Sequence, residues 1–130
     1  MTGEPILIVD DNPANLKLAR LLLTMEGYEA RTAIDAEQAM KLLETFSPRV
    51  ILMDIQLPGM DGLELTRRLK ANPATREIVI LALTAYAMKG DEEKARAAGC
   101  DGYIEKPIDT FTLPGVIMSY LTGAAAQERP

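Results

Sequence analysis

ILIVDDNPAN, residues 6–15, carries an apolar segment directly into two adjacent acids and a proline. The four residues ILIV have the length and β-branched composition of a strand that is buried on both faces, as strands of parallel sheets are. Asn12 followed by Pro13 is typical of a helix start, with asparagine as the N-cap and proline in the first helical position. The stretch predicts a strand that leads into a helix, with Asp10 and Asp11 in the turn between them.

The same alternation continues along the chain. Two strongly apolar segments and two weaker ones predict four more strands: VILM (50–53), IVILAL (78–83), YEARTA (28–33) and DGYIE (101–105). Helix signals separate them, and no repeat or linker interrupts the order. Five strands that alternate with helices over short loops predict a single doubly wound α/β domain, with a parallel sheet covered on both sides.

Each expected strand is followed by a helix signal. Polar N-cap residues mark the first three helices: Asn12, Asp35 with Gln38 three residues later, and Asp61 with Glu64 three residues later, the last two resembling a capping box. DEEKARAAG (91–99) predicts the fourth helix, which ends at a glycine. The fifth is expected over about residues 110–121, where Pro114 favours a start near Thr112.

The composition is that of one globular domain. The chain has 130 residues, 48% hydrophobic and 25% charged, and we expect a domain over 1–122 with a flexible tail over 123–130. The formal net charge of −5 argues against nucleic acid or an anionic membrane surface as a direct partner. Neither a signal peptide nor an apolar run of membrane-spanning length is visible, so we expect a soluble, cytoplasmic protein.

Two residue counts narrow the chemistry. Histidine is absent, which excludes a histidine-based triad, a histidine metal site and a phosphohistidine on this chain. Cys100 is the single cysteine, so the chain forms no internal disulfide, which fits a reducing compartment. The basic residues Arg67, Arg68 and Lys70 lie among acids and are interpreted as a solvated helix face.

Polar residues follow the expected strands at their carboxyl ends: Asp10 and Asp11, then Asp54, Thr84 and Lys106. The functional crevice of an open α/β sheet lies outside these ends, so Asp10, Asp11 and Asp54 converge if the first and third strands are neighbours. Three carboxylates in close contact need a cation. Since all the ligands are hard oxygens, Mg²⁺ is the expected ion.

A carboxylate in this setting is arranged to accept a phosphoryl group. The cation and the Lys106 ammonium would offset charge on the phosphoryl oxygens, and the Thr84 hydroxyl would donate a hydrogen bond to one of them. Taken singly, each residue has an ordinary structural explanation, such as a solvated turn acid or a β-branched strand residue. The prediction therefore depends on the combination.

These residues match a known family. LIVDDN, Asp54 within LMDIQLPGMDG, Thr84 within LALTAYA, and YIEKP with Lys106 and Pro107 resemble the receiver domain of bacterial response regulators over about residues 5–121. The segment TAYAMKGDEEKARAAGCDGYIEKPI is most similar to stand-alone DivK-type receivers and to receivers attached to hybrid kinases. The resemblance implies a flavodoxin-like (βα)5 fold with one five-stranded parallel sheet in strand order 2-1-3-4-5.

The resemblance implies a role for each site residue. Asp54 is the phosphoacceptor, Thr84 and Lys106 bind phosphoryl oxygens, and Mg²⁺ is held by Asp10, Asp11, Asp54 and the main-chain carbonyl of Gln56. The Lys106–Pro107 peptide is expected to be cis. Gln56 and Tyr86 are expected to tune phosphate lifetime, with the bulky Tyr86 slowing self-dephosphorylation.

Tyr103 has two interpretations. The resemblance makes it a switch aromatic that moves inward as Thr84 closes on the phosphate. A half-buried core tyrosine with its hydroxyl at the surface explains the residue equally well.

The implied function is that of a single-domain response regulator in two-component signalling or a phosphorelay. A sensor histidine kinase or a histidine phosphotransfer protein would supply the phosphoryl group. Phosphorylation would change the surface of the fourth helix, fifth strand and fifth helix for a downstream protein target. We expect a monomer or weak dimer that is not an enzyme, since it catalyses only its own phosphorylation and dephosphorylation.

Three other functions compete with this one. A phosphohydrolase of the haloacid dehalogenase type also uses a strand-end aspartate and Mg²⁺, but it needs a second aspartate where this chain has Gln56. A flavodoxin-like electron carrier needs a phosphate-cradling loop after the first strand, and none is visible. A receiver that acts only as an unphosphorylated interaction module is left open, although such modules often lose one of the residues retained here.

Overall fold

The computed structural model describes residues 3–55, 57, 59–84, 89–105 and 111–121. Five strands form one sheet: β1 (Pro5–Val9), β2 (Glu29–Ala33), β3 (Val50–Asp54), β4 (Val79–Thr84) and β5 (Gly102–Glu105). Every neighbouring pair is parallel, and the order across the sheet is β2-β1-β3-β4-β5. The expected fold class and strand order are confirmed.

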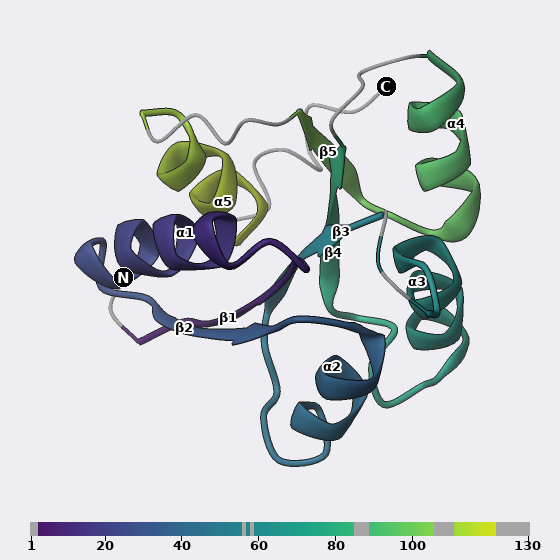
Figure 1. The fold of residues 1–130 in the computed structure, drawn as a ribbon, viewed down its shortest axis with the longest axis horizontal. Helices are drawn as coiled ribbons and strands as arrows, with labels where there is room; N and C mark the ends of the chain where they lie inside the picture. Colours follow the sequence, from purple (N-terminus) through teal and green to yellow (C-terminus); the bar gives the residue numbers. More distant parts are fainter. Residues whose placement is uncertain (1–2, 56, 58, 85–88, 106–110, 122–130) are drawn as a thin grey trace.

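Five helices connect the strands: α1 (Pro13–Met25), α2 (Ala36–Leu42), α3 (Gly62–Ala71), α4 (Lys89–Ala98) and α5 (Leu113–Leu121). In Figure 1, α1 and α5 lie on one side of the sheet, and α2, α3 and α4 on the other. The strands run between the two layers, which makes the fold a doubly wound α/β sandwich. Within the described ranges, every helix is too short or too polar to cross a membrane.

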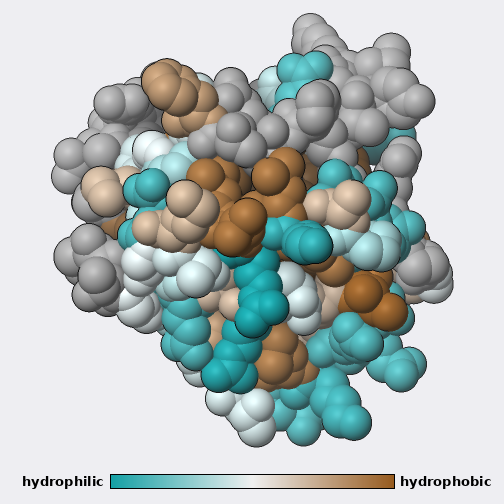
Figure 2. Space-filling view, turned by 60° about the vertical axis from the view of Figure 1, so that its left-hand side comes forward, coloured by the Kyte–Doolittle hydropathy of each residue, from teal (hydrophilic) through white to brown (hydrophobic). Residues whose placement is uncertain are grey.

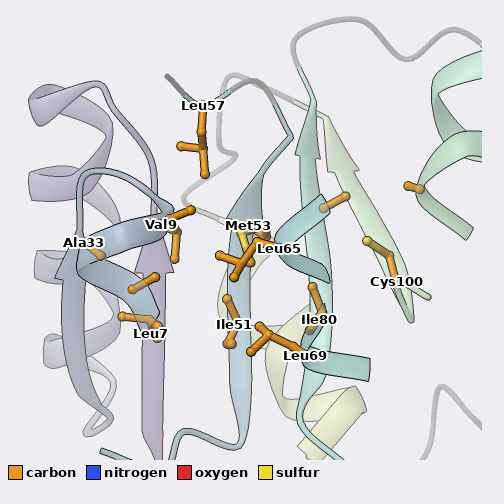
Figure 3. Close-up of a cluster of buried hydrophobic side chains, with 14 of the residues drawn as sticks. Leu7, Val9, Ala33, Ile51, Met53, Leu57, Leu65, Leu69, Ile80 and Cys100 are labelled. Atoms are coloured by element: carbon orange, nitrogen blue, oxygen red, sulfur yellow. The ribbon is translucent and has the colours of Figure 1, made fainter. Parts of the chain in front are cut away.

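The core is divided into two clusters by the sheet. Alternate strand residues face α2, α3 and α4, among them Leu7, Ile51 and Ile80 (Figure 3). The intervening residues, such as Ile8 and Leu52, face α1 and α5. Since β1, β3 and β4 are flanked on both faces, their sequences are continuously apolar, as expected for buried parallel strands.

The molecular surface on the α1 side mixes hydrophobic and hydrophilic residues (Figure 2). Leu18, Leu21 and Met25 of α1 are exposed, whereas Leu16, Ala19 and Leu23 are buried. Leu22, expected in the apolar stripe, is partly buried and packs at the edge of the second cluster. The inner face of α1 is therefore apolar and tightly packed, and its outer face is also partly apolar.

The N-caps lie where the sequence places them, but the capping boxes are only half formed. The Asp35 carboxylate accepts a hydrogen bond from the Gln38 backbone N–H, and Asp61 accepts one from Glu64, each at 2.8 Å. In a complete capping box, the side chains of Gln38 and Glu64 would accept from the backbone N–H of Asp35 and Asp61. Here these two side chains bond to other groups. The Gln38 side chain accepts from the Ile34 N–H, and the Glu64 carboxylate pairs with Arg67 and Arg68.

The start of α5 agrees with the sequence, whereas the start of α4 differs from it. α4 begins at Lys89, two residues before the expected segment 91–99. α5 begins at Leu113, and the Val116 N–H donates to the Thr112 carbonyl, so the start that Pro114 favoured is confirmed. The expected tail over residues 123–130 lies outside the described residues.

Candidate functional site

Three carboxylates meet at the carboxyl edge of the central strands. Val9 of β1 is aligned with Met53 of β3, so the next residues along each strand, Asp10 and Asp54, emerge side by side. One carboxylate oxygen from each of Asp10, Asp11 and Asp54 lies within 4.8 Å of the other two. The expected convergence of these residues is confirmed, and it follows from the pairing of β1 with β3.

The turn after β1 orients the Asp10 side chain and also forms the start of α1. Asp10 is fully buried; its Oδ1 accepts from the Asn12 N–H at 2.9 Å, and its Oδ2 accepts from Asn15 Nδ2 at 3.2 Å. Its own N–H donates to the Ala33 carbonyl at the end of β2. The Asn12 side chain in turn accepts from the Ala14 N–H and caps the helix. One short turn therefore begins the helix and orients the carboxylate.

Asp54 is held by the close approach of α3. Asp54 is 4% exposed. The backbone N–H of the next residue, Ile55, donates to the Leu83 carbonyl of β4. Gly62, the first residue of α3, packs so tightly that an added Cβ would lie 2.1 Å from the Asp54 carbonyl oxygen. The Gly62 N–H donates to the Ile55 carbonyl. The start of α3 therefore packs directly on the backbone that carries the Asp54 side chain.

Thr84 and Tyr103 lie on the neighbouring strands. Thr84 ends β4 and is 5% exposed, one residue beyond Leu83, which is aligned with Asp54. Tyr103 on β5 is half-buried and packs against the cluster on the α2, α3 and α4 side. Its burial agrees with both interpretations of this tyrosine, so the switch role stays a prediction.

Four expected site residues lie outside the described residues: Gln56, Tyr86, Lys106 and Pro107. The carbonyl ligand, the lifetime tuning, the phosphate-binding lysine and the cis peptide therefore stay predictions. Lys106 follows β5 directly in the chain, and Glu105, the last residue of β5, is aligned with Thr84.

Sequence reasoning missed two residues of the site. Asn15 donates to the Asp10 carboxylate, yet it looks like an ordinary first-turn residue of a helix. Gly62 is needed because a side chain there would collide with the Asp54 backbone. Its signal was present but weak, because glycine directly after an N-cap is poorly suited to a helix and indicates a close contact.

The donor set fits a hard divalent cation. Three carboxylates repel one another unless positive charge lies among them, and two of these three are buried. The side chains supply only oxygen, which Mg²⁺ prefers, and Asp11 is exposed, which leaves room for the water ligands that Mg²⁺ retains. The residues present therefore fit this ion.

The family model described as "Response regulator receiver domain" matches residues 6–117. The chain belongs to this family. Among curated proteins, the receiver domain is similar to the polar-differentiation response regulator DivK of Brucella anthropi and of Brucella ovis. Each is 45% identical over 121 residues, which cover 93% of this chain and 98% of the relative. The chain is thus a receiver domain of the DivK type in two-component signalling.

Solved receiver domains share the fold. A response regulator from Chloroflexus aurantiacus superimposes with a TM-score of 0.88 at 30% identity, covering 93% of this chain and 99% of that one. The receiver domain of a sensor histidine kinase from Pseudomonas aeruginosa gives 0.85 at 35% identity, with coverage of 93% and 99%. That structure has a magnesium ion coordinated in its active site cleft.

Proposed function

We propose that this receiver domain accepts a phosphoryl group on Asp54 from a phosphohistidine of a partner protein, with Mg²⁺ bound by Asp10, Asp11 and Asp54. The observation that carries the proposal is the cluster of three carboxylates, whose oxygens lie within 4.8 Å of one another at the strand ends. The neighbouring receiver with magnesium in its cleft supports the choice of ion. The partner would be a sensor histidine kinase or a histidine phosphotransfer protein, since this chain has no histidine.

The reaction is a transfer between two protein side chains. An Asp54 carboxylate oxygen attacks phosphorus, the phosphorus–nitrogen bond breaks, and its electron pair stays on the departing imidazole. Bound Mg²⁺ supplies positive charge for the phosphoryl oxygens. Asp10 and Asp11 would hold that ion, together with the Gln56 carbonyl.

The surrounding residues prepare Asp54 for this step. The side chain is buried, and the packing of Gly62 holds the backbone that carries it, so little reorganisation is needed. The Thr84 hydroxyl at the end of β4 donates to a phosphoryl oxygen, and the Lys106 ammonium offsets its charge. The product is an aspartyl phosphate. The chain acts on no other substrate and is not an enzyme in that wider sense.

Phosphorylation would signal to a downstream protein by changing the surface formed by α4, β5 and α5. Phosphorylation adds about −1.5 to −2 charges, which draws Thr84 toward Asp54 and lets Tyr103 move inward. The surface of α4, β5 and α5 then presents a different shape to a downstream protein target. We place the protein in the cytoplasm as a monomer or weak dimer, without nucleic acid or membrane as a direct partner, consistent with its charge of −5.

Intact mass spectrometry after incubation with acetyl phosphate and Mg²⁺ tests the proposal. We expect one alkali-labile phosphoryl adduct, which disappears with a chelator and in Asp54→Asn. Asp35→Asn is the matched control, because it makes the same chemical change at the N-cap of α2, outside the carboxylate cluster. Its adduct should equal that of the wild type. Absence of an adduct on the wild-type chain would overturn the proposal and favour an unphosphorylated interaction module.

The lifetime of the adduct tests the proposed tuning residue. Tyr86 is bulky enough to screen the aspartyl phosphate from attacking water, so Tyr86→Ala should speed its decay. The decay of the adduct is followed after the donor is removed. An unchanged or slower rate would contradict this role.

A further inference from the structure

A charged network lies at the amino edge of the sheet, opposite the carboxylate cluster. The Lys70 ammonium at the end of α3 donates to the Arg76 carbonyl at 3.2 Å, the Ile78 carbonyl at 2.7 Å and Asp101 Oδ2 at 3.0 Å. These bonds use all three of its donors. Lys70 therefore does not belong to a solvated helix face, as the sequence suggested; its side chain is 20% exposed and is committed to this network.

Asp101 joins three elements just before β5 begins. The same Oδ2 that accepts from Lys70 also accepts from the Ile80 N–H of β4 at 2.9 Å. The Asp101 N–H donates to the Ile80 carbonyl at 2.8 Å, and the Asp101 carbonyl accepts from the Tyr120 hydroxyl of α5 at 3.4 Å. Asp101 thus holds both backbone polar groups of Ile80.

Besides Asp101, the alignment of β5 with β4 depends on Gly102, where an added Cβ would lie 2.2 Å from the Tyr120 hydroxyl oxygen, and on the short sequence of the strand itself. It is a four-residue edge strand that begins with glycine and pairs only with β4 in the described sheet. Its two apolar residues, Tyr103 and Ile104, contact opposite core clusters. A slip by one residue would bring Glu105 or Gly102 to one of these two core positions, so the hydrophobic pattern opposes a slip through only one residue on each face.

We propose that Asp101, held by Lys70, sets the register of β5 and is thereby a positioning residue for phosphoryl transfer at the opposite edge. The inference rests on the proposed function, because it concerns the lysine that follows β5. A slip of one residue moves the strand by about 3.3 Å and takes the carboxylate away from the Ile80 N–H. Glu105, the residue before Lys106, is aligned with Thr84. The same slip would therefore change the distance along the sheet between Lys106 and the carboxylate cluster.

The test compares two substitutions at one position. Asp101→Ala removes the acceptor for Ile80 and Lys70, whereas Asp101→Asn keeps an amide oxygen where Oδ2 serves both donors. We expect Asp101→Ala to lower the rate of phosphorylation by acetyl phosphate by about tenfold to a hundredfold, the cost of a misplacement of about 1 Å or more. Asp101→Asn should restore most of that rate.

The affinity for Mg²⁺ separates positioning from general damage. Asp10, Asp11 and Asp54 lie on or directly after β1 and β3, so the dissociation constant for Mg²⁺ alone should be unchanged in Asp101→Ala. Asp35→Ala is the control for lost stability, because it also removes a side-chain acceptor of a backbone N–H, but at α2. Its phosphorylation rate should equal that of the wild type at a temperature where every variant is folded.

The outcomes are distinct. If Asp101→Ala is phosphorylated at the wild-type rate, or if it loses Mg²⁺ binding in parallel with its rate, the inference is wrong and the proposed function survives. If Asp101→Asn is as slow as Asp101→Ala, the acceptor contact with Ile80 is not what matters, and the inference is also wrong. If the wild-type chain takes no phosphoryl group, the proposed function fails and the inference fails with it.

Discussion

Substituting Gly62 by alanine tests whether the start of α3 holds the Asp54 backbone. The added Cβ would lie 2.1 Å from the Asp54 carbonyl oxygen and 2.8 Å from the Ile55 Cα. These are backbone atoms and cannot rotate away, so α3 must shift from β3. Overpacking of this kind costs about 1–3 kcal/mol, and we expect the upper part of that range. Alanine regains about 0.5–1 kcal/mol of helix propensity, which leaves a net loss of about 2 kcal/mol.

Gly115→Ala is the matched control, because it makes the same change within α5, where an added Cβ meets nothing within 4 Å. Thermal unfolding with a chelator present measures both variants. With about 4 °C per kcal/mol for a chain of this size, Gly62→Ala should melt about 8 °C lower. Gly115→Ala should melt about 2 °C higher, from a gain of about 0.5 kcal/mol.

The stabilisation by Mg²⁺ gives a second, local measurement. Because the new methyl group presses on the backbone that carries Asp54, the rise in melting temperature on adding Mg²⁺ should shrink in Gly62→Ala. The rise should be unchanged in Gly115→Ala. A Gly62→Ala variant that melts at or above the wild-type temperature would refute the close packing of α3 on Asp54.

Three further predictions concern the metal, a helix cap and the cysteine. Mg²⁺ at a hundred times its dissociation constant should stabilise the wild type by about 2.7 kcal/mol in calorimetry, and much less in Asp10→Asn; equal melting with Mg²⁺ and with chelator would contradict the metal site. Asp61→Ala should cost about 1 kcal/mol in urea denaturation, because the Glu64 N–H loses its acceptor; an unchanged midpoint would mean that water replaces the cap. Burial raises the pKa of the Cys100 thiol, so its reactive thiolate is scarcer in the folded chain and a thiol reagent should react far faster in urea; equal rates would show that the thiol is accessible.

The strands and the sheet order could be predicted well because their signals are local or carried by motifs. β1, β3 and β4 each contain a continuous apolar segment, over residues 6–9, 50–53 and 79–83, and this composition is typical of parallel strands that are buried on both faces. The start of α5 followed from the geometry of Pro114. α4 was less well placed, since the acidic residues 91–93 suggested a first turn and no N-cap signal indicated the start at Lys89.

Competition between partners limited the prediction of side-chain contacts. The spacing of Asp61 and Glu64 fits a capping box, but Glu64 also has two arginines within reach on its own helix. The carboxylate pairs with these residues at i+3 and i+4 instead of returning to the cap. Local spacing indicates which contacts are geometrically allowed, and the choice among them depends on which other charges the folded helix brings near.

The two edges of the sheet differ in how far sequence can describe them. At the carboxyl edge, each of these polar residues ends a strand or follows one within two residues, so the topology alone brings Asp10, Asp11 and Asp54 together. At the amino edge, Lys70 meets Asp101 across 31 residues of chain, and neither has a motif that indicates the other. When a strand slips along its neighbour, the residues at both of its ends move by the same distance. The chemistry expected from the carboxyl-edge motif therefore depends on an amino-edge contact that only the folded structure reveals.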